Sequence, residues 1–188
     1  MTPTLYEANK IYSNFSNDES SFLFQSEQII NEDIISKSPE TKAERLNVIN
    51  KIQNNKSIVF TDVSGYLTKL TSKKEYNDSI IDIEIGQEID IESLKERIFN
   101  NGYNKEVITT TTGEYSVRGF VIDIFPINEE YPIRIEFFGN EVESIRYFDP
   151  DTQKSIKKIN KLKIYPFNEK KSNNSESLYS FFEVSLVK

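Results

Sequence analysis

The chain has 188 residues, of which 37% are hydrophobic, which is enough for one sizeable domain or two small ones with a real core. It contains no Cys and no His, so disulfides, thiolate nucleophiles, Cys/His zinc sites and imidazole acid–base chemistry are excluded. The formal net charge of −7 disfavours non-specific binding to a phosphate backbone.

Helices and strands alternate in the predicted structure of the first 75 residues, and this order is typical of an α/β domain. Apolar residues at steps of three and four predict the longer helices, and Pro39 after Ser38 is typical of a first helical position after its N-cap. The predicted elements are a helix over 5–15, a buried strand over 22–24, a helix over 39–53, a buried strand over 58–60 and a short helix over 63–70. The domain begins inside a helix and has no G-x-x-x-x-G-K-[ST] motif, so we expect it to be partial, without a first strand and phosphate loop.

A polar stretch over residues 71–78 predicts a crossing into a second unit. There, isoleucines alternate with acidic residues over 81–85, as in a strand with one solvated face. Further predicted elements are a helix over 91–100 and strands over 115–125, 133–138, 142–148 and 161–165, with a glycine-first two-residue turn at Gly139-Asn140. We expect an α/β domain over residues 1–75, an α+β module with an antiparallel sheet over 76–166, and a linker with the start of a return to the first domain over 167–188.

The predicted strand that ends at Phe138 is the most informative segment for function. Its alternation places Arg134, Glu136 and Phe138 on the solvated face. Arginine and aromatic side chains together are enriched in interface hot spots, which makes this face a candidate protein-binding surface. The alternative is that Phe138 covers a neighbouring strand or turn, and that Arg134 makes an ordinary surface ion pair worth at most about 1 kcal/mol.

Arg118 lies on the predicted neighbouring strand, where Gly119 allows a bulge or a close backbone approach and a second arginine can lie near Arg134. Asp123 follows in an apolar run. A lone acid in a strand pairs with a neighbouring arginine or caps a turn more often than it serves catalysis, so we do not assign it a catalytic role. The acidic turns at 129–130 and 149–151 supply too few converging oxygens for a metal and are expected to be solvated loops.

Three stretches carry more information than their hydrophobic periodicity. They cover residues 113–126, 131–141 and 145–153, and they closely resemble the module shared by bacterial transcription-repair coupling factors and the excision-repair protein UvrB. The ending over 148–156 resembles the coupling factors more than UvrB. Residues 38–46 and 58–64 resemble the degenerate UvrB-like first domain of that family.

The resemblance implies that the module is a non-catalytic adaptor that binds UvrA. Carried over by motif position, the UvrA-contacting residues are Arg118, Arg134 and Phe138. Phe120 departs from the pattern, because many relatives have a second glycine there. The resemblance therefore does not predict the backbone conformation of that strand. The resemblance also implies that this segment holds no cofactor, since ATP and Mg²⁺ belong to motor domains elsewhere in a longer protein, which also contacts RNA polymerase and DNA.

A UvrB-like DNA-contacting module is the alternative, and a nucleotide hydrolase comes third. Residues 79–165 carry 16 acidic and 11 basic side chains, hence 11 − 16 = −5, which argues against DNA contact. No run approaches the roughly 18 apolar residues that cross a bilayer, and no signal-peptide pattern is present, so a cytoplasmic location is expected.

Overall fold

The computed structural model describes residues 1–25, 39–54, 56–168 and 176–178. The chain separates into two compact units, one formed by Met1–Glu75 with Glu169–Lys188 and the other by Tyr76–Asn168. Helix α4 (Lys73–Ser79) contains the division between them. Each unit is described by itself below.

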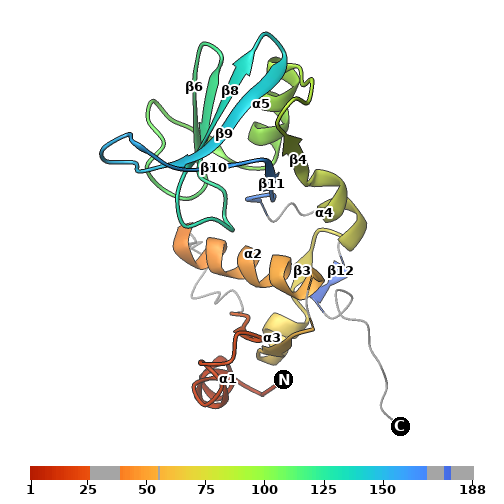
Figure 1. Cartoon of the computed structure of the whole chain (residues 1–188). Helices are drawn as coiled ribbons and strands as arrows, with labels where there is room; N and C mark the ends of the chain where they lie inside the picture. The colour runs from red at the N-terminus through yellow and green to blue at the C-terminus, as the bar shows by residue number, and fades with distance from the viewer. Residues whose placement is uncertain (26–38, 55, 169–175, 179–188) are drawn as a thin grey trace. The chain divides into compact units, whose positions relative to one another are not determined.

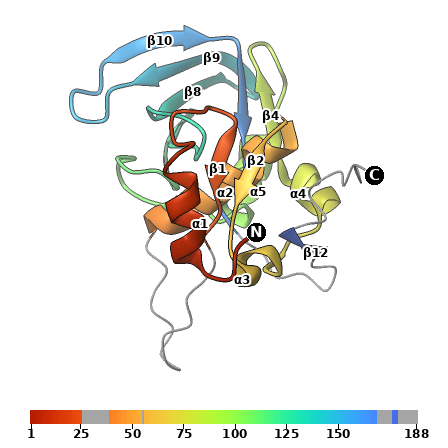
Figure 2. The same cartoon turned by 90° about the horizontal axis from the view of Figure 1, so that it is seen from below.

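The first unit combines helices with two short two-stranded sheets (Figures 1 and 2). Its elements are α1 (Leu5–Tyr12), β1 (Ser21–Leu23), α2 (Pro39–Asn54), β2 (Ile58–Phe60), α3 (Val63–Tyr66), β3 (Lys69–Leu70) and β12 (Glu176–Ser177). Strands β1 and β2 pair in parallel, whereas β3 and β12 are antiparallel. The parallel pair and its helices agree with the predicted α/β character of this region.

Two predicted helices of the first unit are shorter than expected. Helix α1 ends at Tyr12, and Phe15 lies in the following turns, where its ring stacks on Phe60 with 5.4 Å between centroids. Helix α3 ends at Tyr66, and Leu70 belongs to β3 instead. Phe15 and Leu70 have the apolar character and spacing of helical residues, but each packs from a position beyond the end of its helix. The predicted N-cap Ser38 and most of the predicted 167–188 segment lie outside the described residues.

The second unit is built on a six-stranded sheet in the order β10-β9-β8-β7-β6-β5. Its elements are β4 (Ile81–Glu84), α5 (Ile91–Asn100), β5 (Asn104–Lys105), β6 (Glu114–Arg118), β7 (Val121–Ile124), β8 (Ile133–Phe138), β9 (Glu141–Phe148), β10 (Ser155–Ile159) and β11 (Lys161–Ile164). The neighbours in the large sheet are antiparallel except β5 and β6, which are parallel. Strands β4 and β11 form a separate antiparallel pair. The α+β prediction is confirmed.

The core of the second unit is rich in isoleucine. One face of the large sheet and one side of α5 are buried, and the residues that line them are Ile122, Ile124, Ile133, Ile135, Ile145, Ile91, Leu94 and Ile98. Burial of β-branched side chains on a pleated surface favours strands, and the i, i+3, i+7 spacing in α5 gives one apolar stripe. The opposite face of the sheet, called the outer face below, carries the polar and charged side chains.

The second unit differs in detail from the sequence predictions. The predicted strand over 115–125 is a hairpin that turns at Gly119-Phe120, where Gly119 has a φ of +58°. Glycine in first position with positive φ is what such a two-residue turn requires. Strand β11 pairs with β4 and not with the large sheet, and the edge strands β5 and β10 were not predicted. The polar stretch over 71–78, where the sequence predicts a crossing between units, contains helix α4, and the division between the units falls within it between Glu75 and Tyr76.

Candidate partner-binding face

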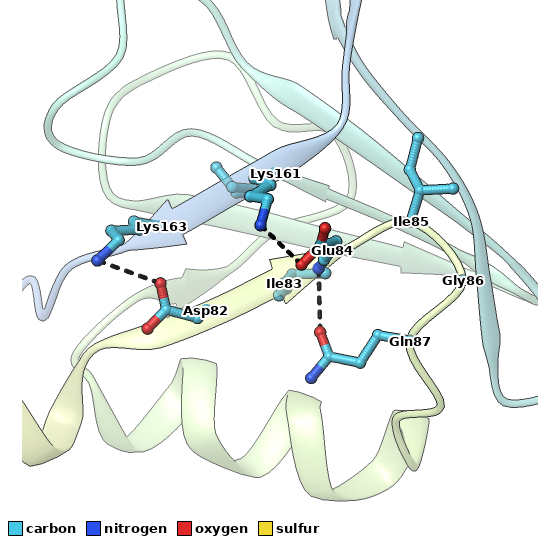
Figure 3. A pocket seen from close by; sticks show the side chains of 9 residues that line it. Asp82, Ile83, Glu84, Ile85, Gly86, Gln87, Lys161 and Lys163 are labelled. Carbon is cyan, nitrogen blue, oxygen red and sulfur yellow. Dashed lines mark hydrogen bonds and ion pairs between the residues drawn. The ribbon is translucent and has the colours of Figure 1, made fainter.

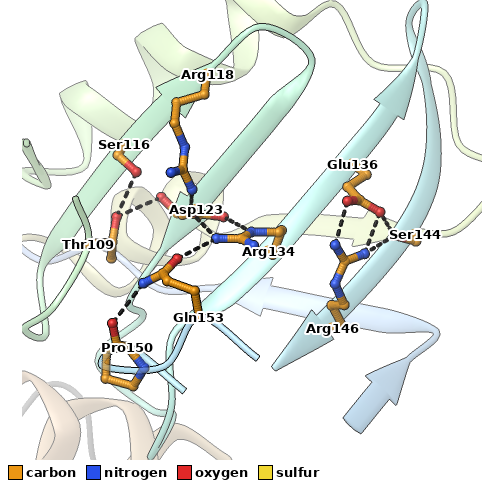
Figure 4. A network of polar contacts seen from close by, with 10 residues as sticks. All are labelled: Thr109, Ser116, Arg118, Asp123, Arg134, Glu136, Ser144, Arg146, Pro150 and Gln153. Carbon is orange, nitrogen blue, oxygen red and sulfur yellow. Dashed lines mark hydrogen bonds and ion pairs between the residues drawn. The ribbon is translucent and has the colours of Figure 1, made fainter. Parts of the chain in front are cut away.

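The candidate site residues lie on the outer face of the large sheet, Arg118 on β6 and both Arg134 and Phe138 on β8. Strand β7 lies between these two strands, so the prediction that Arg118 is on the strand next to Arg134 was wrong, although Figure 4 shows the two arginine side chains meeting at Asp123 of β7. Asp123 of β7 lies opposite Arg134 of β8, and Arg134 lies opposite Arg146 of β9. On the other side of Asp123, Ser116 of β6 is its partner. Side chains of directly opposite residues are close enough to interact, so the register itself assembles a polar row across four strands.

Asp123 joins the two predicted arginines (Figure 4). Its carboxylate accepts hydrogen bonds from Arg134 at 2.7 Å (Nε to Oδ1) and 2.8 Å (Nη2 to Oδ2). Arg118 donates to the same Oδ2 from Nη2 at 2.6 Å. Asp123 is only 2% exposed, and a buried carboxylate needs such pairing to offset its desolvation. The expectation that Asp123 pairs with a neighbouring arginine is confirmed, as is the closeness of Arg118 to Arg134.

The two arginines differ in how far the protein encloses them. The Arg134 side chain is 14% exposed, and its guanidinium carbon lies 4.5 Å from the centroid of the Phe148 ring. Its bond to Asp123 is the main cause that raises the pKa of Arg134. The Arg118 side chain is 53% exposed and contacts Asp123 through one nitrogen. Arg118 therefore keeps most of its donors toward solvent, whereas Arg134 belongs largely to the sheet.

A loop residue completes the shell around Arg134. The side-chain oxygen of Gln153 accepts from Arg134 Nη2 at 2.8 Å, and its amide nitrogen donates to the carbonyl of Pro150 at 2.7 Å. Gln153 has a φ of +59°, a conformation that costs a non-glycine residue about 1–2 kcal/mol. Asp149 starts the turn by accepting from the backbone N–H of Thr152 at 2.7 Å. This acidic turn is a partly exposed loop, in line with the expected solvated loop, and it also positions Gln153.

A second ion pair lies beside the first on the outer face. Glu136 and Arg146 are paired through both carboxylate oxygens, and Ser144 donates to Glu136 at 2.7 Å. The hydrogen bonds from Arg146 are the main cause that lowers the pKa of Glu136 to about 2. Glu136 is thus an internally satisfied carboxylate, and it does not add free negative charge to this face.

Phe138 projects from the end of β8, one residue before the turn, and is 79% exposed. It does not cover a neighbouring strand or turn, which was the alternative. A second aromatic residue, Phe120, is 60% exposed at the tip of the neighbouring hairpin. The backbone N–H of Phe137 donates to the carbonyl of Phe120 at 2.9 Å, so the two hairpin tips are joined. The sequence marked Phe120 only as a departure from the family pattern, although an aromatic residue in a turn was a usable signal.

A hollow elsewhere on the second unit lies over the pair β4–β11 and does not coincide with the arginine cluster (Figure 3). Its polar lining includes two cross-strand ion pairs, Lys161–Glu84 at 3.0 Å and Lys163–Asp82 at 3.4 Å, and Gln87, whose side-chain oxygen accepts from the backbone N–H of Glu84 at 3.0 Å. These exposed pairs are accounted for by strand pairing. Within the described parts of the chain, no cluster of acidic residues could hold a metal ion, and no helix is long and apolar enough to cross a membrane.

Comparison with known proteins identifies the second unit. Residues 81–169 match the model of the UvrB interaction domain family, which defines this unit as an interaction domain and not a catalytic one. The chain is also 35% identical over 173 residues, 90% of its length, to the transcription-repair-coupling factor of Bacillus subtilis (strain 168). It is 32% identical over 168 residues to the proteins of the same name from Staphylococcus epidermidis (strain ATCC 12228 / FDA PCI 1200) and Staphylococcus aureus (strain Mu50 / ATCC 700699), covering 87% of the chain.

The chain is thus similar over most of its length to transcription-repair-coupling factors, and residues 81–169 match the UvrB interaction domain family, as the sequence motifs implied. It spans 15% of the length of the Bacillus subtilis relative and 14% of the two staphylococcal ones. The structure brings Arg118 and Arg134 together on one carboxylate and places Phe138 on the same face of β8 as Arg134. That these three residues contact UvrA stays a prediction. Sequence reasoning missed Gln153, since nothing in the turn sequence signals its positive φ.

Proposed function

We propose that this chain is an adaptor segment of transcription-coupled DNA repair, and that the outer face of its second unit binds UvrA. The observation that carries the proposal is the combination of a 79% exposed Phe138 with an arginine pair already ordered on the same sheet face. An exposed aromatic beside pre-organised guanidinium groups is the composition of an interface hot spot.

The chemistry of the face suggests the chemistry of the partner surface. Two arginines share one carboxylate, so the cluster keeps a net charge of 2 − 1 = +1 in an otherwise acidic unit. An acidic group on UvrA would pair with the open edge of Arg118, and an apolar recess would take Phe138. The charged pair is expected to speed association and make it sensitive to salt, whereas Phe138 is expected to set the dissociation rate.

Calorimetric titration of the chain with purified UvrA tests the proposal. Micromolar or tighter binding is expected, and Arg118→Ala, Arg134→Ala and Phe138→Ala should each weaken it at least about tenfold, or about 1.4 kcal/mol. Phe99→Ala removes a 64% exposed aromatic from α5 and serves as the matched control, with unchanged affinity. A folded parent chain that does not bind UvrA would contradict the proposal.

The alternative of a DNA-contacting module predicts tight, salt-sensitive shifts of DNA mobility by this chain. The charge of −5 over residues 79–165 favours the UvrA proposal instead. A lack of cofactor in this segment, a cytoplasmic location, and contacts of the longer relatives with RNA polymerase and DNA stay predictions.

A further inference from the structure

Asp123 cannot itself reach a partner, yet it contacts both candidate interface arginines. Its side chain is 3% exposed, and its two oxygens accept three hydrogen bonds from Arg118 and Arg134. Its backbone is held as well, because Thr109 donates to the Asp123 carbonyl at 3.3 Å. The carboxylate is therefore a fixed anchor on a central strand, and the arginines take their orientation from it.

Fixing an arginine before binding matters for affinity. A free arginine side chain loses up to about 2 kcal/mol of rotamer freedom when a partner immobilises it. The exposed Arg118 has one bond to Asp123 to restrict it, whereas Arg134 has two such bonds, the oxygen of Gln153 and the Phe148 ring. Removal of Gln153 should thus loosen Arg134 alone, and removal of the Asp123 charge should loosen both.

We infer that Asp123 and Gln153 are positioning residues of the partner-binding face, Asp123 for both Arg118 and Arg134 and Gln153 for Arg134 only. The inference rests on the proposed binding of UvrA by this face. It assigns a binding role to a buried side chain and to a loop residue, neither of which belongs to the predicted contact set.

Asp123→Asn and Gln153→Gly are the test variants in the 188-residue chain. Asparagine keeps the shape of the side chain but removes its charge, and glycine removes the amide while it favours the φ of +59° already present. Both variants are expected to fold, as checked by circular dichroism and thermal unfolding. Glu143→Gln, an exposed carboxylate on β9, is the control for the change of charge.

Each variant should weaken UvrA binding about tenfold, with Glu143→Gln unchanged within about twofold. The loss caused by Gln153→Gly should vanish when Arg134→Ala is also present but persist with Arg118→Ala. The loss caused by Asp123→Asn should shrink with either arginine replaced. In the free chain, ¹H–¹⁵N spectra of the arginine Nε–H groups should change for both arginines in Asp123→Asn and for Arg134 alone in Gln153→Gly.

The possible failures are distinguishable. If the parent chain does not bind UvrA, the proposed function fails and this inference fails with it. If the parent binds and both folded variants bind equally well, only the positioning roles are overturned. Losses that remain the same in every arginine background would also overturn them, since a positioning residue acts through the side chain that it orients. If Asp123→Asn does not fold, Gln153→Gly decides by the same criteria.

Discussion

The ionised side chain of Glu136 contributes to the stability of the fold through its ion pair with Arg146. The side chain of this glutamate is 32% exposed, yet the Arg146 guanidinium and the Ser144 hydroxyl both donate to it. These bonds favour the carboxylate over the neutral acid and hold its pKa well below the ordinary value. Because proton binding then differs between the folded and unfolded chain, the pair makes folding depend on pH.

The pKa of Glu136 falls from 4.5 to about 2 on folding, so its contribution is fully present above pH 4.5 and is lost as the pH falls toward 2. We expect Glu136→Gln to lower the free energy of unfolding by about 1–2 kcal/mol at pH 7, after allowance for solvent screening, and by clearly less at pH 3. Urea unfolding at both pH values measures the difference. Glu143→Gln is the control, and an effect of Glu136→Gln that is equal at both pH values would refute the prediction.

At the scale of elements, β9 shows why the sequence could predict strands better than their register. The turn at Gly139-Asn140 sets Phe138 opposite Glu141, and an unbroken ladder would place Glu136 opposite Glu143. A shift between Glu136 and Phe137 instead brings Ser144 opposite Glu136. The same shift places Arg134 opposite Arg146, and each of these arginines is paired with its own carboxylate, Asp123 or Glu136. Alternation alone does not reveal an extra residue, so the Glu136–Arg146 pair was not predicted.

Periodicity succeeded where one face of an element is buried and the other is not. It predicted the bounds of β8 and α5, and the placement of Arg134 and Phe138 on one face of β8. Of these two side chains only Phe138 is solvated, since Arg134 is 14% exposed. It failed for β10, an edge strand with mainly exposed side chains, and for the hairpin at Gly119-Phe120, where an apolar run hid the turn. The family motif supplied Arg118, which lies on a half-exposed strand end where periodicity carries little information.

Tyr76 is the buried residue of helix α4 in the otherwise polar stretch. It is 4% exposed, and its hydroxyl is buried without a hydrogen-bond partner among the described residues. We expect Tyr76→Ala to lower the free energy of unfolding by about 3–5 kcal/mol through loss of the buried ring. Tyr76→Phe should change it by less than about 1 kcal/mol or raise it, since the hydroxyl is buried unpaired. Urea unfolding compares both variants, and a loss above about 2 kcal/mol in Tyr76→Phe would show that the hydroxyl is bonded.

At the scale of the whole molecule, the strands near the start and the end of the second unit pair with each other. Strand β4 lies near its start and β11 near its end, and they pair in register from Ile81 opposite Ile164 to Glu84 opposite Lys161. The chain thus enters and leaves the unit side by side. A unit with its own buried core and adjacent ends has what a domain needs to fold alone.

We therefore expect the isolated segment of residues 76–168 to fold by itself, and to bind UvrA with the affinity of the whole chain within about threefold if the proposed function holds. Cooperative urea unfolding and a dispersed ¹H–¹⁵N spectrum test its folding without UvrA. A shorter segment that stops at Ile159 is the matched control, because it lacks the buried Leu162 and Ile164 of β11. Loss of these side chains removes about 1.5–3 kcal/mol each and exposes β4, so this control should not fold. An unfolded 76–168 segment would show that the second unit depends on the rest of the chain.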